Sequence, residues 1–226
     1  MVKAIKETAD KGNVAAKEAI IETAERLFAE GGINGVSMRE ISAKAKQGNH
    51  FAVQYHFGSR DGLVQAIFDY RMDQMEPLRG AMLADLEVSG RTKDAWSILE
   101  IILLPQLQID GGTSHFYGNF LSQYLLRQEW VEFGIFGHEA PPNLRKALQL
   151  LRERVDYLPE VVAQRRLVNV SLMFLNLLVR HGRGGGQPTP EPFEHALADT
   201  MEQIVTAMCL PLRLGVAEPI ERRDEQ

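Results

Sequence analysis

Hydrophobic positions recur at three- and four-residue spacing through most of this chain, and no stretch alternates convincingly with a period of two. Such spacing is typical of amphipathic helices, so the sequence predicts an all-α protein. The first stripe runs from Ala16 to Phe28, and Gly31-Gly32 follows it as a left-handed cap would. We predict a first helix from roughly Val14 to Glu30.

The next segment carries helix start and stop signals. Ser37 and Glu40 form a capping-box pattern, in which each side chain satisfies an early backbone N–H group. This pattern predicts a short helix over residues 38–45. Residues 46–48, Lys-Gln-Gly, then break the periodicity.

A third short helix and a longer fourth one are predicted next. Asn49 can cap a helix over residues 50–57, which Gly58 ends. Ser59 caps again and opens a helix that continues toward Leu83.

The remaining sequence predicts a second unit of longer helices. Candidates are residues 92–107, 114–127, 142–154, 159–180 and 192–208. We therefore expect one domain over residues 1–60 and a helical domain over residues 61–226, linked by the helix that begins near residue 60.

Composition fits a folded protein without an exported or membrane-spanning segment. The chain has 226 residues, of which 45% are apolar and 24% are charged. The first 20 residues carry scattered charges and no signal-peptide pattern, and the apolar run over residues 168–179 is shorter than the roughly 20 residues that a span requires. A single cysteine, Cys209, cannot form an internal disulfide. We expect a cytoplasmic protein with no membrane partner.

Catalytic and metal-binding patterns are missing from the sequence. It contains no HExxH, GxSxG, Walker or Rossmann motif. His50 and His56 are six residues apart and would lie on different faces of a helix, which makes a shared metal ion improbable. We expect no catalytic residue, no cofactor and no metal.

The charge distribution points to one region that could meet a polyanion. The net charge is −5, yet residues 1–75 hold ten basic and ten acidic residues, so the acidic excess lies further on. Between Ser37 and Arg60 there are four basic residues and one acidic residue, a local balance of +3. A few phosphate contacts suffice for binding through counterion release, so a basic patch matters more than the total charge.

Three short helices with a tight turn before the third describe a helix-turn-helix, whose last helix can lie in the DNA major groove. His50, Gln54 and Tyr55 could reach base edges or phosphates, and Phe51 could contact a thymine methyl group. Ala52-Val53 is small enough to pack inward.

The stretch from Ala19 to Arg71 resembles the N-terminal domain of the TetR family of transcriptional regulators. The family commonly has Ala-Gly-Val-Ser in the turn and Tyr-x-His-Phe at the end of the recognition helix. This chain has a turn one residue longer, residues 45–48, and Gln54 where that tyrosine would stand. The matching positions are Ala24, Leu27-Phe28, Gly31-Gly32, Gly35, Ser37, Arg39, Ile41, Ala45, Tyr55-His56-Phe57, Ser59-Arg60 and Leu63.

The resemblance implies roles for residues of this segment. It implies that Ser37, Tyr55 and Arg60 contact phosphates, beside the basic Arg39, and that His56-Phe57 locks the third helix onto the fourth. It also implies a groove-facing set made up of Gln47, Asn49, His50, Phe51 and Gln54. Structural alternatives stay open: Ser37 can serve as a helix cap, His56 can be a packing residue, and Arg60 can simply begin the fourth helix.

Two late helices indicate a subunit interface. Residues 168–179 are apolar on nearly every face, which is typical of a helix buried all round. With the last helix, they resemble the C-terminal helix pair through which TetR-like regulators form homodimers. One thick monomeric core is the alternative. The candidate interface residues are Val170, Phe174, Leu177, Leu178, Leu197, Met201 and Ile204.

An aromatic stripe in residues 114–127 suggests a ligand cavity. The candidate lining residues are Trp96, Phe116, Phe120, Tyr124 and Met173. Simple core packing is the alternative, and the case for a small-molecule effector rests on the family resemblance.

Together these features predict a ligand-responsive homodimeric regulator. It would be a repressor that a small, largely apolar effector releases from a palindromic double-stranded DNA operator, although activation remains open. One rival is an α-helical enzyme, lipid carrier or small-molecule-binding protein without DNA binding. Another is an interaction protein whose helix-turn-helix only packs.

Overall fold

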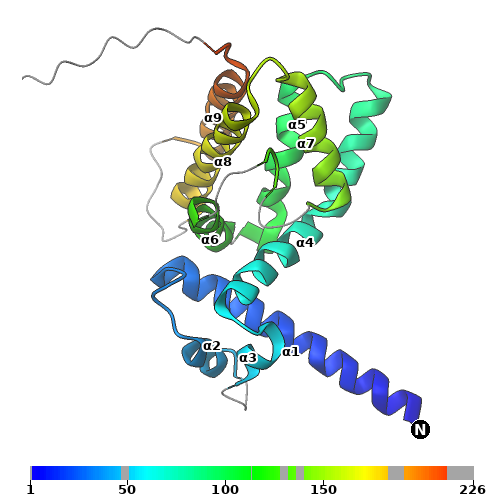
Figure 1. The fold of residues 1–226 in the computed structure, drawn as a ribbon, viewed down its shortest axis with the longest axis vertical. Helices are drawn as coiled ribbons and strands as arrows, with labels where there is room; N and C mark the ends of the chain where they lie inside the picture. The colour runs from blue at the N-terminus through cyan, green and yellow to red at the C-terminus, as the bar shows by residue number, and fades with distance from the viewer. Residues whose placement is uncertain are drawn as a thin grey trace, which may run out of the picture.

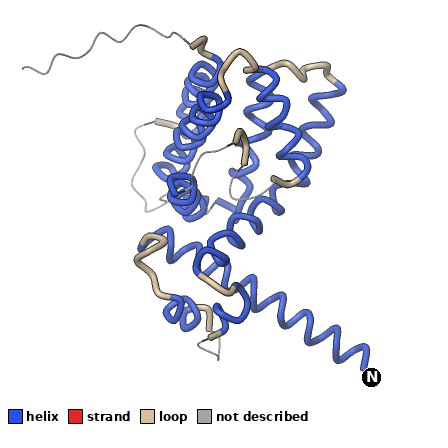
Figure 2. Tube along the Cα trace, viewed as in Figure 1, coloured by secondary structure: helices blue, strands red, loops and turns tan. Residues whose placement is uncertain are grey.

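The structure, a computed structural model, describes residues 2–46, 51–112, 114–127, 132–135, 140–182 and 191–212. In these ranges the regular elements are all helical, which confirms the predicted all-α class (Figure 2). The helices are α1 (Val2–Gly31), α2 (Met38–Lys44), α3 (Ala52–Phe57), α4 (Arg60–Val88), α5 (Ala95–Leu103), the 3-10 helix η1 (Leu104–Gly112), α6 (Ser114–Arg127), α7 (Pro142–Arg154), α8 (Glu160–Gly182) and α9 (Phe193–Cys209).

Two groups of helices share the long helix α4 (Figure 1). The small group of α1, α2 and α3 lies at the lower end, and α4 runs from it into the larger bundle of α5 to α9. α8 and α9 lie side by side, and α6 lies at the junction against α1. The DNA-binding domain expected from the sequence is therefore attached through both α4 and α6.

Most predicted helix limits agree with the structure, with three exceptions. α1 begins at Val2 rather than near Val14, because residues 2–11 are mostly good helix formers even though no apolar stripe marks them. α3 begins at Ala52 rather than at residue 50. The helix predicted over residues 92–107 divides into α5 and η1, at the point where Pro105 lacks a backbone donor.

The predicted caps form around α2 and α4. The Ser37 hydroxyl oxygen accepts a hydrogen bond from the Glu40 backbone N–H at 3.1 Å, and Ser59 does the same for Gly62 at 3.0 Å. In a full capping box the Glu40 carboxylate would accept from the Ser37 backbone N–H. Here it forms an ion pair with Lys44 at 2.9 Å instead.

One buried ion pair fastens α1 to α4. Arg71 donates two hydrogen bonds to the two carboxylate oxygens of Glu25, at 2.7 and 2.9 Å, and both side chains are almost completely buried. Around this pair, apolar side chains of α1 and α4 form part of a core that continues into the larger bundle. The orientation of α1 is thus fixed by a bidentate contact as well as by packing.

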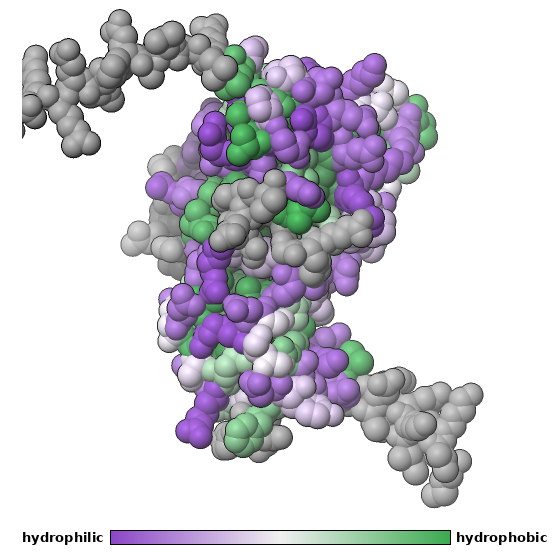
Figure 3. Space-filling view, in the orientation of Figure 1, coloured by the Kyte–Doolittle hydropathy of each residue, from purple (hydrophilic) through white to green (hydrophobic). Residues whose placement is uncertain are grey.

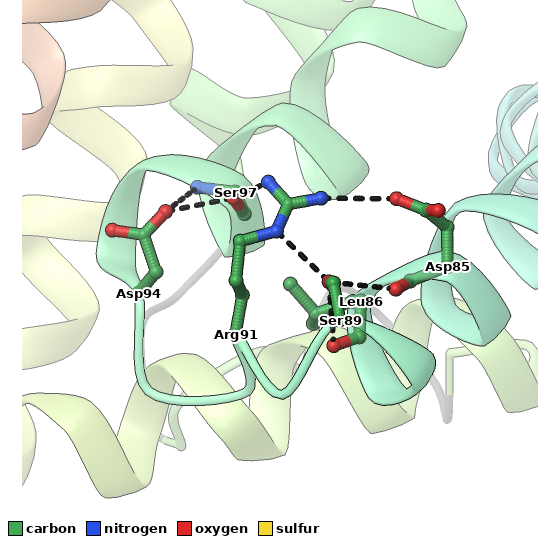
Figure 4. A network of polar contacts seen from close by, with 6 residues as sticks. All are labelled: Asp85, Leu86, Ser89, Arg91, Asp94 and Ser97. Carbon is green, nitrogen blue, oxygen red and sulfur yellow. Dashed lines mark hydrogen bonds and ion pairs between the residues drawn. The ribbon is translucent and has the colours of Figure 1, made fainter.

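A polar network fixes the corner between α4 and α5 (Figure 4). The Arg91 guanidinium donates to Asp85, Ser89 and Ser97 at 2.8 to 2.9 Å. Asp94 caps α5 by accepting from the backbone N–H and the hydroxyl of Ser97, at 3.0 and 2.7 Å. These contacts set the angle at which α4 enters the bundle.

We expect Asp94→Ala to lower the free energy of unfolding by about 1 kcal/mol, because the first turn of α5 loses its cap. Asp94→Asn is the matched control, since asparagine caps nearly as well. Urea denaturation at pH 7 measures both, and equal losses for the two variants would contradict the capping role.

Acid should remove the difference between the wild-type protein and Asp94→Ala. The Ser97 hydroxyl that donates to Asp94 holds the pKa of its carboxyl below the ordinary value of 3.8. Because the pKa of Asp94 is lower in the folded state, its ionised carboxylate stabilises the protein above about pH 3.8. This contribution is lost as the pH falls through the folded-state pKa. The deficit of Asp94→Ala should therefore shrink below about pH 3.8.

One described helix, over residues 160–181, is long and apolar enough to cross a membrane, but 56% of its most apolar window is buried inside the protein. This burial agrees with the place of α8 in the bundle.

Candidate DNA-binding surface

α3 is held at the lower tip of the molecule with one side facing outward. Phe51 and Tyr55 are 70% and 80% exposed, and Gln54 between them is also exposed. Ala52 and Val53 are buried, as their size predicted. Three predicted DNA-contacting side chains therefore share the open face of a helix whose other face packs on its neighbours.

The end of α3 is fixed by the residues that follow Tyr55. The His56 ring meets Tyr55 and Phe57 edge-on, with centroid distances of 5.0 and 6.1 Å, and Phe57 packs against the core. Gly58 then turns the chain with φ = 71°. Burial, and then the charge of Lys17, lowers the pKa of His56 below 6.5. A largely neutral His56 fits the packing role.

Ser37, Arg39 and Arg60 occupy different settings. Ser37 is exposed and caps α2, and Arg39 is exposed. The Arg60 guanidinium instead donates to the backbone carbonyls of Ile33 and Val36, both at 2.5 Å. Arg60 thus helps to close the loop between α1 and α2, a role that the sequence did not predict, and its phosphate contact stays a prediction.

Gln47, Asn49 and His50 lie outside the described residues. Lys46, just before them, has φ = 54° and is exposed. A lysine in the left-handed region is uncommon, and here it ends α2 at the predicted break.

Positive charge surrounds this tip. Arg39, Lys44 and Lys46 are exposed, and of these Lys44 pairs with Glu40. Figure 3 shows a mainly hydrophilic surface on the small domain with an apolar area at its lower end. Basic side chains beside exposed aromatic and amide groups suit a phosphate backbone with base edges behind it.

Gln123 on α6 connects the bundle to the small domain. Its amide nitrogen donates to the Phe28 carbonyl at 2.9 Å, and its oxygen accepts from the Ile33 backbone N–H at 2.9 Å. Both backbone groups lie where α1 ends. A displacement of α6 would therefore be transmitted directly to the turn that precedes α2.

Two further α6 residues strengthen the junction. Arg127 donates to the side chains of Asn34 and Asp61, both at 3.1 Å. Tyr124 donates to Gln65 at 2.9 Å, and burial raises the pKa of its hydroxyl to about 12. No local pattern in the sequence predicts these contacts, since the partners are 59 to 93 residues apart.

The predicted aromatic pocket is largely core. Phe120 and Tyr124 are fully buried, and the Tyr124 ring stacks on Phe68 with a centroid distance of 4.6 Å. Phe116 and Trp96 are half-buried, and the Trp96 indole N–H donates to a glutamate one turn further along α5 at 2.9 Å. The rings fill the space between helices, so the core alternative describes them better.

A cavity of about 40 Å³ lies deeper in the bundle, and none of the five predicted residues lines it. Met173 instead borders a surface groove between α8 and α9. The cavity is lined by Phe68, Met72, Arg79, Ile102, Leu103, Gln106, Leu121, Leu125, Leu144, Leu148, Leu167 and Ser171.

The predicted dimer residues divide into two groups. Leu177 is buried but lines a groove of about 840 Å³ between α8 and α9, and Leu197 is partly buried against the core. The other five, Val170, Phe174, Leu178, Met201 and Ile204, are buried within a single chain. They belong to the core of the single chain, in which α8 packs against both α6 and α9.

Among the described residues no group of three or more His, Cys, Asp or Glu side chains is placed to hold a metal ion.

The geometry defines a helix-turn-helix protein in which α3 is presented outward by α1, α2 and α4. Residues 20–67 match the family model described as "Bacterial regulatory proteins, tetR family". The N-terminal part of the chain is therefore similar to the DNA-binding domain of that family.

Curated relatives match a part of the chain of similar length. The chain is 46% identical over 52 residues to "HTH-type transcriptional regulator Mb3439c" of Mycobacterium bovis and to "HTH-type transcriptional repressor Rv3405c" of Mycobacterium tuberculosis. Each match covers 23% of this chain and 27% of the relative. The likeness thus spans about a quarter of the relatives' length, and the larger helical bundle lies mostly outside it.

Proposed function

We propose that this protein is a homodimeric repressor of transcription that binds a palindromic DNA site with α3 and leaves it when a small effector binds the helical bundle. The single observation that carries the proposal is the exposure of Phe51, Gln54 and Tyr55 on a helix whose opposite face is buried. The repressor role is supported by the printed name of one relative.

The shortness of α3 makes its supports part of the mechanism. A six-residue helix cannot hold an orientation on DNA by itself, so α1, α2 and α4 must fix its angle. The buried Arg71–Glu25 pair and the Arg60 contacts supply that rigidity. Groove contacts would then fall to Gln54 and Phe51, and a phosphate contact to the Tyr55 hydroxyl.

A dimer would bring two such helices to one duplex. Helix-turn-helix dimers read half-sites about 34–36 Å apart, one helical turn of DNA. The outer groove of α8 and α9 mixes apolar and polar side chains over two long helices, which suits a partner subunit in the same arrangement. The proposed site of action is the cytoplasm, where the DNA is.

Effector release requires that the ligand bind the DNA-incompetent arrangement better than the competent one. The contacts of Gln123 and Arg127 supply a route from α6 to the α1–α2 turn. A coupling of about 1–3 kcal/mol would weaken DNA binding roughly 5- to 150-fold.

Selection of bound duplexes from a random pool tests the proposal. We expect a symmetric consensus with half-site centres about 10 base pairs apart. An asymmetric consensus would contradict the dimeric geometry. Failure to enrich any duplex would favour the rival in which the bundle binds small molecules and DNA has no part.

A further inference from the structure

The larger bundle buries a cation whose charge is poorly matched. The Arg79 side chain is 1% exposed, and its Nε has no hydrogen-bond partner. Among the described residues, its other nitrogens reach only the Met72 carbonyl at 3.4 Å, the sulfur atoms of Met72 and Met75 at 3.8 and 3.5 Å, and Glu76 at 3.6 Å. All of these exceed the usual length of a charge-assisted hydrogen bond.

Glu76 is mainly engaged elsewhere. Its two carboxylate oxygens accept from the backbone N–H groups of Asn143 and Leu144 at 2.9 and 3.1 Å, which caps the start of α7. Burial lowers the pKa of Arg79, but a guanidinium keeps its proton in proteins. A positive charge therefore stands in the core with one distant and already occupied counterion.

Two other buried polar groups near this cation lack partners. The Gln106 side-chain oxygen has no hydrogen-bond partner, and Gln106 lines the same 40 Å³ cavity as Arg79. The Tyr117 hydroxyl is fully buried, has no partner, and lies within electrostatic reach of Arg79. Unpartnered buried polar groups are rare in native proteins, and three of them close together form a polar spot that a bound group could satisfy.

The rest of the cavity wall is apolar. Apart from Arg79, Gln106 and Ser171, its side chains are all hydrocarbon or thioether groups, contributed by α4, α5, α6, α7 and α8. A ligand that satisfied Arg79 would therefore place one anionic end against α4 and an uncharged, apolar body among α6, α7 and α8. An apolar wall with one convergent charge is the usual form of a small-molecule site.

We propose that the effector of this protein is a small monocarboxylate with an apolar body, whose carboxylate pairs with Arg79 inside the bundle. This inference names the chemical class of the effector in the proposed function and rests on it for the regulatory consequence, but not for the binding itself.

The size of the cavity links binding to DNA release. A volume of about 40 Å³ holds only a few water molecules, so an eight-carbon acid must push the helices apart. Leu121 and Leu125 line the cavity from α6, on the same helix as Gln123 and Arg127. Expansion of the cavity would therefore displace α6, whose side chains form hydrogen bonds with the α1–α2 turn.

Calorimetric titration of the full-length protein with sodium octanoate, 1-octanol and 1-octylamine tests the site. We expect saturable binding of octanoate, at least tenfold weaker binding of octanol, and none of octylamine. Equal affinity for octanoate and octanol, absence of octanoate binding, or uptake of only chloride from the buffer would overturn the proposal.

Arg79→Met identifies the residue that selects the carboxylate. The variant should melt at the same temperature as the wild-type protein or higher, because an apolar side chain replaces an unmatched buried charge. It should also lose the preference for octanoate over octanol, whereas Arg165→Met, at an exposed position of α8, should keep it. A retained preference in Arg79→Met would overturn the assignment.

A second variant keeps the test decisive if Arg79→Met does not fold. Leu125→Phe narrows the cavity without changing any charge, and we expect it to weaken octanoate binding at least tenfold. Wild-type affinity in Leu125→Phe would place the ligand elsewhere and overturn the proposal.

The regulatory step is measured separately on a selected duplex. Saturating octanoate should weaken DNA binding at least fivefold in the wild-type protein and leave Arg79→Met unaffected. DNA binding that ignores octanoate overturns the effector assignment and leaves the proposed function standing. Octanoate binding through Arg79 in a protein that enriches no duplex overturns the proposed function and leaves the ligand site standing.

Discussion

Arg71→Met is expected to lower the free energy of unfolding by about 3–5 kcal/mol, because it leaves the carboxylate of Glu25 buried without its counterion. Both side chains are 2–3% exposed, and the two hydrogen bonds between them are 2.7 and 2.9 Å long. Chemical denaturation at a fixed protein concentration measures the loss. A marginally stable domain would lose much of its stability.

The double variant Glu25→Met/Arg71→Met is the control for that result. Removing both charges and filling the space with apolar groups should recover most of the loss, since a complete buried pair contributes little net stability. A double variant as unstable as Arg71→Met would show that packing, rather than the unpaired carboxylate, is responsible. A loss below about 1 kcal/mol in the single variant would contradict the buried-pair interpretation.

The two buried arginines of α4 make this comparison sharper. Arg71 and Arg79 lie eight residues apart on the same buried stripe, yet one is bidentately paired and the other is not. Replacement by methionine should therefore destabilise the protein at residue 71 and not at residue 79. Sequence reading marked neither residue for this purpose, although a cation within an apolar stripe is a visible signal.

Local signals were enough to predict most of the helices. Ser37 and Ser59 cap the helices that their sequence context predicted, and the break after α2 falls at Lys46. These features depend on residues within one helical turn, which the sequence displays directly. The limits of α1 and η1 were predicted less well, because no stripe marks the first and Pro105 redirects the second.

The candidate DNA-binding surface was predicted only in part, because some of its contacts join residues far apart in the sequence. The outward position of Gln54 and Tyr55 followed from two small neighbours that had to pack inward. The Arg60 contacts join residues 24 and 27 positions apart, and the Gln123 contacts span 90 and 95. Such pairs depend on how the helices pack against one another. The hydrophobic period and the residue spacing of a single sequence do not predict that packing.

The same limit applies to the aromatic stripe of α6, for which the sequence allows either a pocket or simple core packing. Phe120 and Tyr124 are buried, and the Tyr124 ring stacks on Phe68 of α4 with a centroid distance of 4.6 Å. A cavity lies apart from the predicted residues, where mainly aliphatic side chains of several helices meet around Arg79. The ligand role of the aromatic side chains stays a prediction.

Gln54→Glu is expected to weaken binding to a selected duplex by about 100-fold or more. Gln54 is exposed on α3, so the isosteric change leaves the fold intact while it turns the proposed base-edge donor into a carboxylate, which the DNA phosphates would repel. A loss of about 1.4 kcal/mol at each half-site is tenfold, and a dimer carries the change at both half-sites, so the losses multiply. Fluorescence anisotropy at one fixed salt concentration measures the affinity, because nonspecific binding varies steeply with salt.

Gln108→Glu provides the matched control for Gln54→Glu. Gln108 is exposed on η1, in the larger bundle, and its replacement changes the net charge by the same amount. If DNA affinity depended on total charge alone, both variants would weaken it equally. If α3 enters the groove, only Gln54→Glu should weaken DNA binding. Both variants should keep the melting temperature and the oligomeric state of the wild-type protein. A loss smaller than threefold in Gln54→Glu would mean that α3 packs in the protein without reading DNA, and that another surface must supply the contacts.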